Sequence, residues 1–138
     1  MSEHTILLIE DNPDDAELTR IAFAEARIDG RLVVVGDGAE ALDYLFARGR
    51  HAGRDASELP SIVLLDLNLP KLDGREVLQA LRASPATRGL PVVVLTTSTE
   101  PFDVEASYAL GVNSYIRKPV DFGKFVEVVK QIGLYWLV

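Results

Sequence analysis

The stretch IVLLDLNLP, residues 62–70, sets one carboxylate, Asp66, inside a run of aliphatic side chains. A short apolar run without polar alternation is typical of a strand that is covered on both faces of a parallel sheet. A buried carboxylate is costly unless it is paired or bound to a metal. The stretch therefore predicts a central strand that ends in a functional acid.

Four further short runs accompany this one, and helical patterns separate them. The runs are TILLIE at 5–10, LVVV at 32–35, VVVLTT at 92–97 and SYIR at 114–117. The first three are nearly continuous in aliphatic residues, whereas the last is more polar and is expected at a sheet edge. Strand and helix alternate five times, which predicts an α/β doubly wound sandwich with a parallel sheet.

The first helix has a readable beginning. Asn12 is a suitable N-cap, and Asp15 lies in the first turn, where the helix dipole favours negative charge. Leu18, Ile21 and Ala22 form the expected inward stripe. The remaining helices are expected at about residues 39–48, 75–83 and 101–110, and from about 121 onward.

Length, composition and charge bound the possible functions. The chain has 138 residues and no cysteine, with 14 Lys+Arg against 21 Asp+Glu and a formal charge of −7. We expect one domain, residues 1–138, with an apolar C-terminal extension at 134–138. The missing cysteines exclude disulfides and thiolate chemistry, and the negative charge argues against nucleic-acid binding. With no export signal and no membrane-spanning apolar run, the expected location is the cytoplasm.

Polar residues follow four of the five predicted strands. Glu10 and Asp11 end the first, Asp66 the third, Thr96 the fourth and Lys118 the fifth. Ligands of open α/β sheets bind beyond these carboxyl ends. Three carboxylates, one Mg²⁺ and one ammonium have charges that sum to zero, so such a site can accept a phosphoryl group on a carboxylate.

Each of these residues has an ordinary explanation when taken alone. Glu10 and Asp11 can cap a helix, Lys118 can be a surface lysine, and Thr96 can close a strand. Asp66 in its apolar run is harder to explain that way. The joint pattern, on the proper strand ends, is more specific than any part.

Two other segments stand out. The longest connection, GRHAGRDASELP at 49–60, is polar, and we expect it to be a solvated surface loop, basic residues included. The chain end LYWLV, at 134–138, is unusually apolar. It is either a helix end packed on its own domain or a self-complementary interface. The second interpretation predicts a homodimer through Leu134, Tyr135, Trp136 and Leu137.

The motifs ILLIEDN, LLDLNLPKLDG, VVVLTTS and YIRKP resemble the response-regulator receiver family, and the resemblance covers essentially the whole chain. It implies a flavodoxin-like (βα)5 fold with strand order 2-1-3-4-5. It implies a phosphorylation-dependent switch of a two-component system that catalyses only its own phosphoryl transfer and dephosphorylation. The implied partner is a sensor histidine kinase, without direct DNA binding or membrane attachment. The loop 49–60, YLFARG and IGLYWLV are most similar to stand-alone regulators of bacterial phytochrome kinases.

The resemblance also implies individual roles. Asp66 resembles the phospho-acceptor, and Glu10 and Asp11 resemble the acidic pair that holds Mg²⁺ together with the backbone carbonyl of Asn68. Glu10 stands where Asp is frequent, but its longer arm still reaches the cation. Thr96 resembles the hydroxyl that moves toward the phosphoryl group.

Lys118 resembles the lysine that binds a phosphoryl oxygen, and the following bond to Pro119 resembles the family's cis peptide. Tyr115 resembles the switch aromatic whose ring turns inward when Thr96 moves. Thr97 is larger than the residue common at its position, which is expected to narrow access to the phosphoryl group.

Two rival functions use the same residues differently. A phosphatase of the haloacid dehalogenase type also has an aspartyl nucleophile, but it needs a second acid two residues later, where this chain has Asn68. The other rival is an interaction module that keeps the fold and is never phosphorylated. It predicts that a phosphodonor with Mg²⁺ adds no mass to the protein.

Overall fold

The computed structural model describes residues 4–96, 101–118 and 121–136. Its centre is a parallel sheet in the order β2-β1-β3-β4-β5, as expected. The strands are β1 (Thr5–Ile9), β2 (Arg31–Val35), β3 (Ile62–Leu65), β4 (Val92–Thr96) and β5 (Ser114–Arg117). The helices are α1 (Pro13–Glu25), α2 (Gly38–Leu45), α3 (Gly74–Ala83), α4 (Pro101–Ala109) and α5 (Phe122–Trp136), with a short 3₁₀ turn η1 (Gly49–His51).

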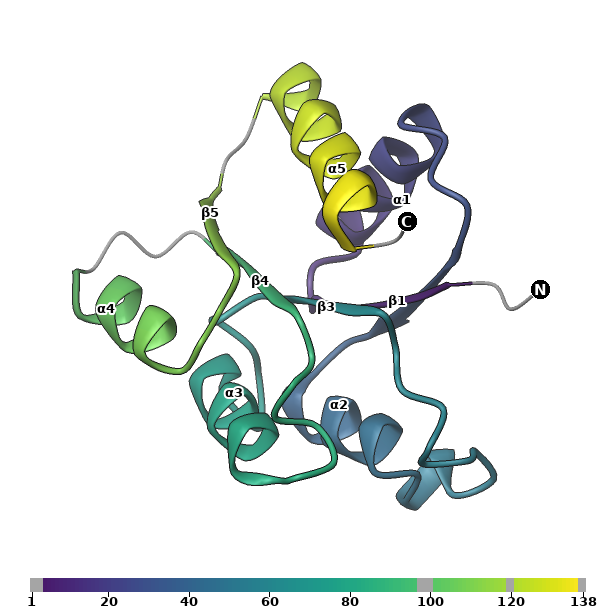
Figure 1. Cartoon of the computed structure of the whole chain (residues 1–138), viewed down its shortest axis with the longest axis vertical. Coiled ribbons are helices and arrows are strands. Elements are labelled where there is room, and N and C mark those ends of the chain that lie inside the picture. Colours follow the sequence, from purple (N-terminus) through teal and green to yellow (C-terminus); the bar gives the residue numbers. More distant parts are fainter. Residues whose placement is uncertain (1–3, 97–100, 119–120, 137–138) are drawn as a thin grey trace.

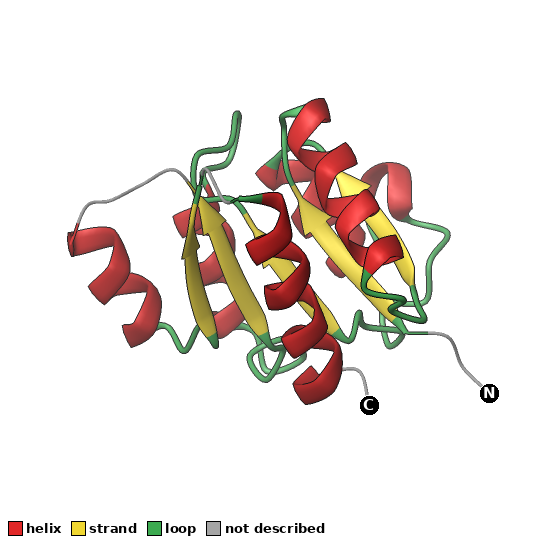
Figure 2. Ribbon diagram, turned by 90° about the horizontal axis from the view of Figure 1, so that it is seen from above, coloured by secondary structure: helices red, strands yellow, loops and turns green. Residues whose placement is uncertain are grey.

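The helices form a layer on each face of the sheet. α1 and α5 lie side by side on one face, and α2, α3 and α4 lie on the other (Figure 1). Figure 2 shows the strands running in parallel, so their carboxyl ends share one edge of the sheet. No helix in the described part of the chain is both long and apolar enough to span a membrane.

The central strands are covered on both faces, as their sequence predicts. In β3, Val63 and Leu65 belong to the core beneath α2 and α3, whereas Ile62 and Leu64 belong to the core beneath α1 and α5. All four side chains are at most 2% exposed. The prediction of full coverage is wrong for β2, because this strand is an edge of the sheet and Val34 is 45% exposed.

Helix α1 begins as predicted, but of the predicted inward stripe only Ala22 is buried. The side chain of Asn12 caps it by accepting hydrogen bonds from the two following free backbone N–H groups. Leu18 and Ile21, expected inside, are 47% and 37% exposed, whereas Thr19 is buried. Thr19 can face the core because its hydroxyl donates to the Asp15 carbonyl, at 2.9 Å, and so is not left unsatisfied.

The loop after α2 is mostly exposed, as predicted, and basic residues in it also contact that helix. α2 ends at Leu45, three residues before the predicted end. His51 Nε2 lies 3.0 Å from a carboxylate oxygen of Glu40, and the Arg54 guanidinium lies 3.8 Å from the centroid of the Tyr44 ring. The basic residues of the loop therefore anchor it on α2.

Candidate functional site

The sheet brings the predicted acids together through its backbone. Ile9 and Leu65 are paired neighbours at the ends of β1 and β3, and the Asp66 N–H donates to the Ile9 carbonyl at 3.1 Å. Glu10 and Asp66, one residue further along each chain, therefore leave the sheet side by side. On the other side of β3, Lys118 N–H donates to the Thr96 carbonyl at 2.6 Å.

The three acidic side chains form a cluster with one open side. Oxygens of Glu10, Asp11 and Asp66 all lie within 4.8 Å of one another. Glu10 is 3% exposed and Asp66 is 7% exposed, whereas Asp11 is open to solvent. Oxygen ligands of this kind suit a hard divalent cation, and the exposed side gives it access.

Lys118 is the cation at this cluster in the structure. Its Nζ donates to Glu10 Oε1, to Asp66 Oδ2 at 3.2 Å and to Asp15 Oδ2 at 2.9 Å. The contact with Asp15 was not expected, since the sequence gives Asp15 an ordinary place in the first turn of a helix. No spacing signal could have revealed it, because the contact joins residues 103 positions apart.

A second set of hydrogen bonds fixes the loop that follows Asp66. The Asn68 N–H donates to Asp66 Oδ1 at 3.0 Å, and its side-chain amide donates to Thr96 Oγ1 at 3.3 Å. Thr96 is fully buried. Gly74 approaches the same loop so closely that a Cβ there would lie 2.3 Å from the Asp66 carbonyl oxygen. The acceptor candidate and the hydroxyl candidate are thus joined through one residue.

Burial and charge shift the ionisation of the site in opposite directions. Burial raises the pKa of Glu10 from 4.5 to about 7, although Lys118 opposes this shift, and the negative charge of Asp66 adds to it. Burial alone would lower the pKa of Lys118, but its hydrogen bonds to Glu10 and Asp15 raise it above the usual value. Lys118 is therefore charged at neutral pH, while Glu10 titrates near neutrality in the metal-free protein.

Several predicted residues are only partly placed. Tyr115 is half-buried and packs against the core on the α2–α3 face. The backbone of α5 runs to Trp136, but the side chains of Leu134, Tyr135 and Trp136, and all of Leu137, lie outside the described part of the chain. Thr97 and the Lys118–Pro119 bond also lie outside it.

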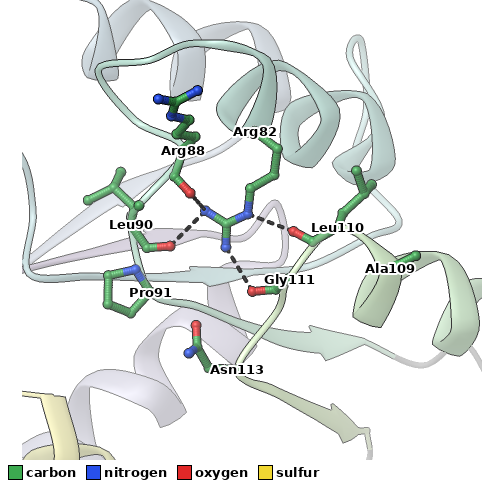
Figure 3. A pocket seen from close by; sticks show the side chains of 9 residues that line it. Arg82, Arg88, Leu90, Pro91, Ala109, Leu110, Gly111 and Asn113 are labelled. Carbon is green, nitrogen blue, oxygen red and sulfur yellow. Dashed lines mark hydrogen bonds between the residues drawn. The ribbon is translucent and has the colours of Figure 1, made fainter.

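A second polar arrangement lies where α3 and α4 end. Arg82 of α3 donates to the backbone carbonyls of Leu90, Leu110 and Gly111, at 2.6 to 3.0 Å, beside a hollow of about 390 Å³ (Figure 3). It donates to a fourth carbonyl, that of Arg88, at 2.9 Å. Because these bonds join the connections that follow α3 and α4, Arg82 has a structural role.

Comparison with known proteins identifies relatives along most of the chain. Residues 6–130 match the response regulator receiver domain family. The probable methanogenesis regulatory protein FilR2 of Methanothrix harundinacea is 47% identical over 132 residues, covering 96% of this chain and 83% of that protein. Response regulator Rcp1 of Synechocystis is 41% identical over 132 residues, covering 96% of this chain and 88% of Rcp1.

Solved structures agree in fold as well as in sequence. The phosphorylated cyanobacterial phytochrome response regulator RcpA matches with a TM-score of 0.87 and 41% identity, covering 99% of this chain and 95% of that one. The Mn²⁺-bound form of Rcp1 matches with a TM-score of 0.85 and 40% identity, covering 97% of this chain and 94% of that one. The acidic cluster, the strand order and these relatives lead to one conclusion: the chain belongs to the response-regulator receiver family of two-component signalling.

Proposed function

We propose that the carboxylate of Asp66 receives the phosphoryl group that switches this receiver. The observation that carries the proposal is its surroundings. Asp66 is nearly buried, lies within 4.8 Å of the oxygens of Glu10 and Asp11, and accepts hydrogen bonds from Lys118 and from the Asn68 N–H. A carboxylate in this position is oriented by donors and can be reached from the side on which Asp11 is exposed.

The transfer is a displacement at phosphorus. An oxygen of Asp66 supplies the electron pair of the new P–O bond, the P–N bond of a phosphohistidine breaks, and its electron pair stays on the imidazole. Nothing is oxidised or reduced. Asn68 and Lys118 hold the carboxylate in place, and the Lys118 ammonium can exchange one of its present acceptors for an oxygen of the incoming group.

The cation proposed for the cluster is Mg²⁺, held by Glu10, Asp11 and Asp66 together with the backbone carbonyl of Asn68. The donor set supports it, because hard oxygen ligands that leave room for water and phosphoryl oxygens suit this ion. That the similar protein Rcp1 has been solved in a Mn²⁺-bound form supports a divalent ion. When bound, Mg²⁺ would offset the negative charge that the carboxylates and the phosphoryl group bring together.

The response to phosphorylation is proposed to start at Thr96 and Lys118. Thr96 Oγ1 already accepts a hydrogen bond from the Asn68 amide of the Asp66 loop, so a move of the Thr96 hydroxyl toward a phosphoryl oxygen would lengthen this bond. A shift of Thr96 would release space in which Tyr115, two strand positions before Arg117, turns inward. Such a change biases the surface formed by α4, β5 and α5 toward one of two states.

The chain is proposed to catalyse only its own phosphorylation and dephosphorylation. A turnover phosphatase of the haloacid dehalogenase type would need a carboxylic acid where Asn68 stands. The Asn68 side chain instead donates to Thr96. Sustained release of phosphate from a generic phosphoester would favour that rival.

The proposed donor is a histidine kinase of the phytochrome type, and the proposed location is the cytoplasm, where such a kinase has ATP. Similarity to Rcp1 and RcpA along nearly the whole chain supports this pathway. The relative FilR2 is a probable methanogenesis regulatory protein, so phosphotransfer to this chain should be measured from both phytochrome and non-phytochrome histidine kinases. Preferential transfer from a non-phytochrome kinase would contradict the light pathway but not the role of Asp66.

We also propose that the chain forms a homodimer through its apolar end, Leu134 to Leu137. The apolar run LYWLV supports this, since contiguous apolar side chains on a surface usually mark a contact. Sedimentation should show a dimer that becomes a monomer when the chain is cut before Leu134. An unchanged mass after the cut would refute the interface.

Intact-mass spectrometry tests the central proposal. Incubation with acetyl phosphate and Mg²⁺ should add the mass of one phosphoryl group, and EDTA should prevent the addition. Asp66→Asn should abolish it. Asp29→Asn, which removes an exposed carboxylate elsewhere, is the matched control and should leave it intact. Persistent phosphorylation of Asp66→Asn would overturn the assignment.

A further inference from the structure

We propose that Asp15 is a positioning residue that restrains phosphorylation by holding the Lys118 ammonium in the resting state. The inference rests on the proposed role of Asp66. It assigns a role to a carboxylate on α1, outside the group that is proposed to bind Mg²⁺ and phosphoryl.

The geometry at Lys118 shows competition for a limited number of donors. An ammonium has three N–H groups, and here they face Glu10, Asp15 and Asp66. A phosphoryl oxygen that binds Lys118 must take the place of one of these acceptors. Phosphorylation is therefore coupled to the loss of an existing bond.

Asp15 is the acceptor most readily given up. Its side chain is 37% exposed, whereas those of Glu10 and Asp66 are 2% and 9% exposed. Water can solvate Asp15 once it is released, but a buried carboxylate that lost the ammonium would stay without compensation. We therefore expect Lys118 to leave Asp15 first.

The backbone of Asp15 is held so that its side chain keeps facing Lys118. Its N–H donates to Asn12 Oδ1 at 3.1 Å, and its carbonyl accepts the Thr19 hydroxyl at 2.9 Å. These two bonds fix the first turn of α1 on both sides of the residue. The contact with Lys118 is thus part of the folded turn.

The negative charge of Asp15 disfavours phosphorylation, as its competition for the Lys118 ammonium also does. Asp15 adds a fourth carboxylate to Glu10, Asp11 and Asp66, so the site with one Mg²⁺ and Lys118 is not neutral but carries a formal charge of −1. A phosphoryl group brings further negative charge into it. Removing the charge of Asp15 should therefore make the phosphorylated state more favourable.

Asp14 offers a matched control. It lies in the same first turn, carries the same charge and equally faces the helix N-terminus. Within the described residues its side chain is exposed and no ion pair joins it to Lys118. Asp14→Asn therefore reproduces the loss of charge and the effect on α1, but not the release of Lys118.

The test measures binding of beryllium fluoride, a mimic of the phosphoryl group, at saturating Mg²⁺. Mg²⁺ affinity without the mimic is measured separately by calorimetry. Asp15→Asn should bind the mimic about threefold to fivefold more tightly, the effect expected for one partly exposed ion pair. Asp14→Asn should stay within about twofold of the wild type, and Asp15→Glu, which keeps the charge, should restore wild-type affinity. Mg²⁺ affinity should change similarly in the Asp14 and Asp15 amide variants.

Each other outcome has a definite meaning. Unchanged or weaker binding by Asp15→Asn, while the wild type binds the mimic, overturns the role of Asp15. Equal tightening in Asp14→Asn shows a general charge effect and overturns it as well. If the wild type itself does not bind the mimic, the proposed function of Asp66 is what fails.

Discussion

The metal-free protein should lose stability as the pH rises from 4.5 to 7, because Glu10 is buried where its charged form is disfavoured. Burial moves the pKa of Glu10 in the folded state from 4.5 to about 7. The folded state therefore binds a proton in this interval that the unfolded state has released. The stabilisation is complete below pH 4.5 and is lost as the pH rises through 7.

The size of the loss follows from the pKa interval. At about 1.4 kcal/mol for each pH unit, the shift from 4.5 to about 7 makes Glu10 account for at most about 3.5 kcal/mol of unfolding free energy. Urea denaturation in EDTA, at intervals between pH 5 and pH 8, measures it. Glu10→Gln has no titrating group at this position and should show a flatter profile, so the difference between the two profiles isolates the contribution of Glu10.

A divalent cation should reverse the effect. Mg²⁺ binds the ionised carboxylate. At saturating Mg²⁺, the unfolding free energy of the wild type should therefore no longer fall toward pH 8 relative to that of Glu10→Gln. Parallel profiles of wild type and variant in EDTA would refute the reasoning. A wild type that gains stability over Glu10→Gln between pH 5 and pH 8 in EDTA would refute it as well.

Two further predictions concern the supports around the site. Gly74→Ala should lower the unfolding free energy by about 2–3 kcal/mol, because its Cβ would lie 2.3 Å from the Asp66 carbonyl oxygen. Gly53→Ala is the control, and with open space around it the unfolding free energy should change by less than about 0.5 kcal/mol. Equal urea midpoints for the two variants would contradict this. Arg75→Leu should lower the unfolding free energy by about 3 kcal/mol, because it removes the partner of a buried carboxylate. Asp103 is 5% exposed and accepts two hydrogen bonds from the Arg75 guanidinium, at 2.5 and 2.6 Å. A loss below about 1 kcal/mol in urea denaturation would show that this ion pair between α3 and α4 is weakly coupled to folding.

The arrangement of strands and the main acids could be predicted because the signals are local. Each strand is a short aliphatic run, and the acids follow these runs directly. Once the strands are known to be parallel, their carboxyl ends must lie at the same end of the sheet, and the pairing of β1 with β3 then places Glu10 beside Asp66. The strand order itself came from the family resemblance, since no residue pattern in the chain fixes it.

The details that could not be predicted depend on the rotation of each helix about its axis and on tertiary contacts between elements. Leu18 and Thr19 are neighbours on α1, and periodicity alone does not decide which one faces the core. The hydroxyl of Thr19 finds a carbonyl within the helix, and this makes its burial possible. Likewise, the contact of Asp15 with Lys118 depends on the packing of α1 over the strand ends.

The loop 49–60 is mostly exposed, as its polar composition predicts, but its contacts with α2 could not be predicted. Basic residues in a long connection usually indicate a solvated segment, and nothing in the sequence pairs them with α2. In the structure, Arg50 lies 3.6 Å and His51 lies 3.0 Å from a carboxylate oxygen of Glu40. Because Glu40 belongs to α2, these contacts hold the start of the loop against the helix that precedes it.

The most direct test asks which atom carries the phosphoryl group. The protein is phosphorylated with acetyl phosphate and Mg²⁺ and then reduced with borohydride, which converts a phosphorylated aspartate into homoserine. Peptide mapping should find homoserine at position 66 and unchanged aspartate at position 11. Homoserine at position 11, or an unreduced peptide around position 66 in protein that carries the added mass, would contradict the account.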